Sequence, residues 1–238
     1  MFYNTTCSTL NILDEGKTEL AQKIKRDAGI INIACIPTSI GTRLPKLIKD
    51  FQEKNTKSPY FILHDAFSLP ILDGLTNGKY DIGICSRDLH YQELSFIPLF
   101  LKKSMVIVPP HSSTWPCEEE INTLDATTLQ LNYVFREDTN WASVRHELNA
   151  KCPNLTFAES YDGEIAIAGQ VVENNDVGIV ADTVLVNSFN VVKVPLAVPS
   201  DTRTVYIAYN HTRQIAPTLQ AFIDYIQSTM HNITLRFR

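Results

Sequence analysis

Three hydroxyl side chains come directly after short apolar segments and could together bind an anion. Thr38 and Ser39 follow the strand-like run Ile30–Cys35, and Ser86 follows a second such run at Asp81–Cys85. Hydroxyls beside the free N–H groups and the positive dipole end of a following helix provide the donors that oxyanions require. Serine and threonine in such places also cap helices and turns without any ligand, so this second interpretation stays open.

Two cysteines give the best case for catalysis. Cys35 and Cys85 both stand near predicted strand ends, where a thiol pair could exchange protons or one thiol could act as a nucleophile. Packing is the commoner explanation, since free cysteine is among the most buried residue types. The sequence has no phosphate-binding glycine motif, nucleophile elbow or zinc-binding helix, and its six histidines show no metal-ligand spacing. We therefore expect no catalytic residue, metal or cofactor.

The first half of the chain alternates strand-like and helix-like segments. Either of the first two hydroxyls could cap a helix through Phe51, whose apolar residues recur at helical spacing. Ser68 is placed to cap the next helix, which Asn77 and Gly78 would end. This alternation is typical of a parallel sheet, in which ligands bind at the carboxyl ends of the strands, so Ser86 would share an edge with the first two hydroxyls. The predicted strands are Ile30–Cys35, Tyr60–His64, Asp81–Cys85, Leu94–Leu101 and, separately, Met105–Val108.

The second half repeats this order and predicts a second α/β unit. Its expected strands are Leu131–Phe135, Leu155–Glu159, Val177–Ala181, Val191–Val194 and Val205–Tyr209. Helices are predicted from residue 139 or 140 to Ala150, from Asp162 to about Val172, and over Ala216–Met230. A further helix is predicted near the N-terminus, over Leu10–Ala28, with Gly29 placed to end it.

The composition is that of an ordinary globular protein. Of 238 residues, 44% are hydrophobic and 20% are charged, which is enough to build two compact lobes or one large domain. The net charge of −5 disfavours a chain that binds nucleic acid by itself, since such chains present a basic face. No apolar run is long enough to span a bilayer, and no secretory signal opens the sequence. Five cysteines without regular spacing fit a reducing compartment, so we expect a cytoplasmic protein.

Four segments, taken in order, resemble the effector-binding domain of LysR-type transcriptional regulators. INIACIPTSIGTRLPKLIKDF resembles that family's opening strand, polar turn and helix, and LTNGKYDIGI resembles its leucine–glycine–aspartate segment. Two later segments resemble the crossover into the second lobe and the late strand beside the cleft. The later segments are Ile97–Leu99 with Met105–Pro109, and Gln170–Val180, so that the match covers Gly29 to about Met230.

The resemblance implies an α/β fold with two Rossmann-like lobes, similar to type 2 periplasmic-binding proteins, joined by two crossover segments around a ligand cleft. Residues 1–29 would be the remnant of a linker helix, residues 30–101 with 204–238 the first lobe, and residues 102–203 the second. Crossovers near Leu101–Met105 and Arg203–Tyr206 would form the hinge. The family's effector contacts carry over to Thr38, Ser39 and Ser86, and in the second lobe to Asp138, Thr139 and Asn140.

The resemblance also implies a function. Such a domain binds a small anionic metabolite between its lobes and transmits the change to DNA-binding heads. Self-association into a dimer or tetramer is expected, through the Gly41–Phe51 helix and a helix of the second lobe. DNA would be contacted only through a helix-turn-helix domain that we do not find in this sequence, and no membrane contact is expected. The alternatives are a solute-binding protein that serves a transporter and, less favoured, an enzyme that depends on Cys35 or Cys85.

Overall fold

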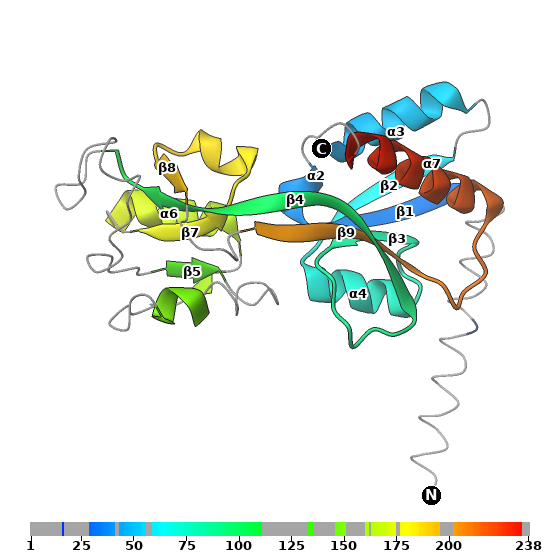
Figure 1. Ribbon diagram of the computed structural model, residues 1–238, viewed down its shortest axis with the longest axis horizontal. Coiled ribbons are helices and arrows are strands. Elements are labelled where there is room, and N and C mark those ends of the chain that lie inside the picture. Colours follow the sequence, from blue (N-terminus) through cyan, green and yellow to red (C-terminus); the bar gives the residue numbers. More distant parts are fainter. Residues whose placement is uncertain are drawn as a thin grey trace, which may run out of the picture. The chain divides into compact units, whose positions relative to one another are not determined.

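The computed structural model divides the chain into two compact units (Figure 1). Unit 1 extends to Leu99 and resumes at Tyr206, and unit 2 comprises Phe100–Val205. The predicted segments Leu10–Ala28, apart from Gly16, and Leu155–Glu159 lie outside the described residues. The described residues are 16, 29–40, 43–55, 59–110, 133–135, 146–150, 160–161, 163–174, 177–195 and 202–234.

Unit 1 is built on a mixed sheet in the order β2-β1-β3-β9. Strand β1 (Ile30–Cys35) lies in the middle and pairs in parallel with β2 (Tyr60–Asp65) and with β3 (Ile82–Cys85). Strand β9 (Thr202–Asn210) runs antiparallel to β3. The expectation of a parallel sheet is therefore confirmed for the first three strands, and β9, which returns from the far end of the sequence, makes the sheet mixed.

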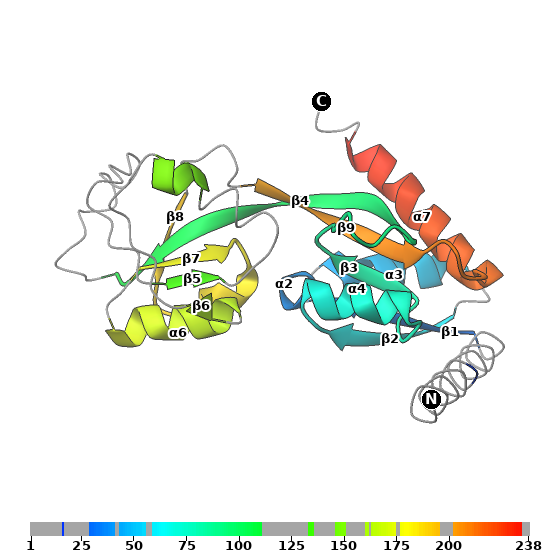
Figure 2. The ribbon, with the colours of Figure 1, turned by 90° about the horizontal axis from the view of Figure 1, so that it is seen from below.

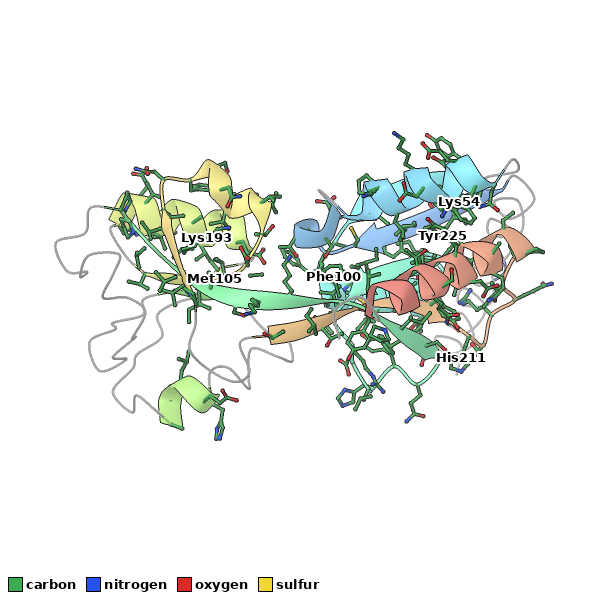
Figure 3. All side chains as sticks on the ribbon, turned by 45° about the horizontal axis from the view of Figure 1, so that its top comes forward. Lys54, Phe100, Met105, Lys193, His211 and Tyr225 are labelled. Atoms are coloured by element: carbon green, nitrogen blue, oxygen red, sulfur yellow. The ribbon has the colours of Figure 1, made fainter. Side chains whose placement is uncertain are left out.

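Helices cover both faces of this sheet (Figures 1 and 2). Helices α3 (Arg43–Lys54) and α7 (Pro217–Thr234) share one face, where the rings of Phe51 and Phe222 lie 5.0 Å apart, centroid to centroid, and that of Phe61 on β2 lies 4.8 Å from Phe222. Figure 3 labels Lys54 on α3 and Tyr225 on α7, and the ammonium of this lysine lies 5.1 Å from the ring centroid. These aromatic contacts attach the C-terminal helix to the first helical layer.

Helix α4 (Ser68–Thr76) covers the opposite face and ends where the sequence predicts. Asn77 is the C-cap residue, with its N–H bonded to the carbonyl of Asp73, and Gly78 follows with φ of 79°. Glycine adopts this left-handed conformation without the strain that a Cβ would add. The predicted stop at Asn77 and Gly78 is therefore confirmed.

One long strand replaces two predicted ones. Strand β4 runs without a break over Leu94–Val108, so the predicted separation of Leu94–Leu101 from Met105–Val108 is wrong. The polar stretch between them stays extended because its backbone forms hydrogen bonds with the neighbouring chain. The N–H of Asp182, directly after β7 (Gly178–Ala181), donates to the carbonyl of Lys103 at 2.7 Å. Strand β4 thereby carries the chain from unit 1 into unit 2.

Unit 2 is also a mixed α/β unit, as the second half of the sequence predicts. Strand β4 pairs antiparallel with β7 (Gly178–Ala181) and β8 (Val192–Pro195), whereas β5 (Tyr133–Phe135) pairs in parallel with β7 and with β6 (Ser160–Tyr161). Helix α6 (Glu164–Asn174) and the 3₁₀ helix η2 (Val184–Ser188) pack on this sheet. The apolar cluster that they share consists of Ile107, Ile167, Ala168, Val171, Val180 and Val186.

The connection from β3 to β4 is tied to helix α4 by two side-chain hydrogen bonds. The hydroxyl of Tyr91 donates to Oδ1 of Asp73 at 2.7 Å, and Thr76 donates to Glu93 at 2.8 Å. The bond to Asp73, with a smaller contribution from burial, raises the pKa of Tyr91 from 10.0 to about 12. The phenol thus keeps its proton in the folded state at a pH where the unfolded chain has lost it.

We expect this bond to give the stability of the protein a specific alkaline dependence. Because the pKa of Tyr91 is higher in the folded state, its contribution is complete below pH 10 and is lost as the pH rises toward 12. Urea unfolding of wild type and Tyr91→Phe at several values between pH 8 and pH 12 measures this. The difference in unfolding free energy between the two proteins should shrink with pH. A constant difference would contradict the assignment.

Candidate functional site

The carboxyl ends of three parallel strands meet at one edge of the unit 1 sheet. Cys35 at the end of β1 pairs with Ile84 near the end of β3. The chain continues this contact beyond the strand, as the N–H of Ile36 donates to the carbonyl of Ile84 at 3.0 Å. On the other side, the N–H of Ala66 after β2 donates to the carbonyl of Cys35 at 3.1 Å. Residues that follow these strands are therefore neighbours.

Thr38 and Ser39 lie at this edge but do not cap the long helix that was predicted. They belong to a separate four-residue helix, α2 (Pro37–Ile40), so the prediction that either hydroxyl caps the helix through Phe51 is wrong. That helix itself is confirmed as α3, over Arg43–Lys54. Ser39 is 5% exposed, and its hydroxyl oxygen makes no hydrogen bond among the described residues. Buried hydroxyls almost always have a partner, so Ser39 has hydrogen-bonding capacity to offer a ligand or a water.

Ser86 and Ser68 complete the polar edge. The backbone N–H of Ser86, a buried residue, donates to the hydroxyl oxygen of Ser68 at 3.2 Å. Ser68 is the first residue of α4, and the N-cap position is taken by Phe67, which makes no side-chain cap. The prediction that Ser68 caps this helix is therefore wrong. Its place directly after β2, like Thr38 after β1, is the signal that could have identified it as a site residue.

The N-terminus of α4 adds main-chain donors to these hydroxyls. No acidic residue lies in its first turn and no side chain caps it. The first N–H groups of a helix have no intrahelical acceptor, and the helix dipole is positive at that end. At this edge Ser39, Ser68 and the first turn of α4 thus present neutral donors, which suit a carboxylate, another oxyanion or a hydroxylated molecule.

The other three predicted contacts cannot be placed. Asp138, Thr139 and Asn140 lie outside the described residues. Of the predicted site, the structure therefore brings together Thr38, Ser39 and Ser86, all in unit 1.

The two cysteines considered for catalysis do not form a pair. Cys35 faces the same side of the sheet as its partner Ile84, and Cys85, the next residue of β3, faces the other side. Both thiols are fully buried, with 0% exposed. A shared substrate could not reach both of them. Among the residues that the structure describes, no group of three or more histidine, cysteine, aspartate or glutamate side chains could hold a metal ion.

A pocket at the opposite edge of unit 1 is built from residues with structural roles. Asp81, Arg213 and Leu219 are among its lining residues, near the start of β1. Asp81 accepts hydrogen bonds from Asn32, and Arg213 donates to the carbonyl of Thr76 at the end of α4 at 2.8 Å. The charged groups of this pocket therefore hold the fold together.

Comparisons with known proteins agree on one family. The LysR substrate binding domain family matches residues 25–231. The chain is 24% identical over 219 residues to YybE, an uncharacterized HTH-type transcriptional regulator of Bacillus subtilis strain 168, covering 90% of this chain and 73% of that protein. No helix among the described residues has the length and apolar character needed to cross a membrane.

Two solved structures show the same fold. The effector-binding domain of QuiR, in complex with shikimate, superposes with a TM-score of 0.73 at 22% identity, covering 85% of this chain and 97% of that one. The effector-binding domain of BenM with its effector benzoate gives a TM-score of 0.64 at 16% identity, covering 86% and 93%. The expected fold class, similar to type 2 periplasmic-binding proteins, is thereby confirmed. The family match spans most of the sequence, and the chain belongs to the LysR substrate binding domain family.

Proposed function

We propose that this chain is the effector-sensing regulatory domain of a LysR-type transcriptional regulator and that its effector is a small anionic metabolite. Membership of the family and the similarity to an HTH-type regulator support the regulatory role. Shikimate, which is bound to the effector-binding domain of QuiR, and benzoate, the effector of BenM, are both carboxylates. The ligand class is inferred from the cluster of neutral donors at the strand ends of unit 1, above all the buried hydroxyl of Ser39, which has no hydrogen-bond partner among the residues that the structure describes.

In this proposal the donors of unit 1 hold the charged end of the effector. Hydrogen bonds from hydroxyls and main-chain N–H groups to an ionised oxygen are stronger than those between neutral groups. Thr38, Ser39 and Ser86 remain the proposed contacts of the first lobe, to which we add Ser68. The polar run from Asp138 to Asn140 is proposed to contribute from unit 2.

Effector binding regulates only if it favours one conformation over another. A ligand shifts a conformational equilibrium by its difference in affinity for the two states and by nothing else. We propose that the change passes to DNA-binding heads through a helix-turn-helix domain and that the domain self-associates through the α3 helix. The proposed partners are thus an effector, a second copy of the chain and, through the heads, DNA.

Removing two of these donors should weaken effector binding strongly. We expect Ser39→Ala combined with Ser86→Ala to lower affinity about 30-fold, since each hydrogen bond to a ligand contributes roughly 1 kcal/mol. Calorimetry with shikimate, benzoate and other small carboxylates measures this. Ser228→Ala is the matched control, because its hydroxyl donates to the carbonyl of Tyr225 on α7. An unchanged affinity in the double variant would remove the proposed site.

A further inference from the structure

We draw no further inference here: the strongest candidate, the pocket of unit 1 between the amino end of β1 and the first turn of α7, is lined by charged side chains that already hold the fold together, and nothing among the described residues shows what would occupy it.

Discussion

Replacing Gly178 by valine is expected to destabilise unit 2 by about 3 kcal/mol or more, at the upper end of the range for overpacked cores. Gly178 opens strand β7 directly beneath helix α6. A Cβ at this position would lie 2.6 Å from Cγ2 of Ile167, 2.9 Å from Cγ2 of Val171 and 3.1 Å from Cγ1 of Ile107. All three neighbours are fully buried, so they have no free space into which to move. Helix α6 would have to leave the sheet to admit the new side chain.

A second glycine in the same unit provides the control. Gly169 lies on α6, and a Cβ there would meet only Cε1 of Phe189, at the ordinary contact distance of 3.9 Å. Gly169→Ala should therefore stabilise the protein by roughly 0.5–1 kcal/mol, the usual gain for alanine over glycine inside a helix. Urea unfolding followed by far-ultraviolet circular dichroism measures both variants. Equal unfolding midpoints for Gly178→Val and wild type would show that α6 does not pack as described.

Local sequence patterns correctly predicted those helices and strands in which buried residues recur at regular spacing. The run Ile30–Cys35 is a strand because its apolar side chains are buried on a sheet with helices on both faces. Helix α4 and its end at Asn77 follow equally local rules, since the cap and the glycine after it lie within a few residues. Such features depend on the chain near them and can be inferred without the fold.

Features that depend on distant partners escaped the sequence analysis. The stretch Lys102–Ser104 is polar and was expected to interrupt a strand, yet β7, about 80 residues further on, pairs with it and keeps it extended. Likewise, the acceptor that Ser68 provides is used by the N–H of Ser86, which no local rule for caps could indicate. Tertiary hydrogen bonding outweighed local propensity in both places.

The candidate site was predictable in part for the same reason. Ligands bind at the carboxyl ends of parallel strands, and this rule identified the hydroxyls after β1 and β3 as candidates. The strand register places those two strand ends together. The separation of α2 from α3 and the burial of Ser39 follow from packing, which a single sequence does not reveal. The sequence thus predicted the edge of the sheet that matters, but not all of its donors.

Replacing the aspartate of the family-like segment LTNGKYDIGI is expected to lower the free energy of unfolding about as much as replacing Gly178. Asp81 stands just before β3 and faces Asn32, which is buried in the middle of β1. Oδ2 of Asp81 accepts the backbone N–H of Asn32 at 2.7 Å and its Nδ2 at 3.2 Å, and the N–H of Asp81 donates to the carbonyl of Asn32 at 2.9 Å. This reciprocal set joins β3 to β1 where their ladder begins.

Asp81→Ala should therefore cost about 3 kcal/mol, because it leaves two buried donors of Asn32 without an acceptor, at roughly 1–3 kcal/mol for each unsatisfied group. Asp81→Asn keeps an oxygen at the same place and should cost about 1 kcal/mol, the difference between a charged and a neutral acceptor. Asp224→Ala on α7, an exposed carboxylate bonded to Gln220, serves as the control for loss of charge alone. Urea unfolding at neutral pH ranks the three variants. If Asp81→Ala and Asp224→Ala were equally stable, the hydrogen bonds of Asp81 between β1 and β3 would not stabilise the fold as proposed.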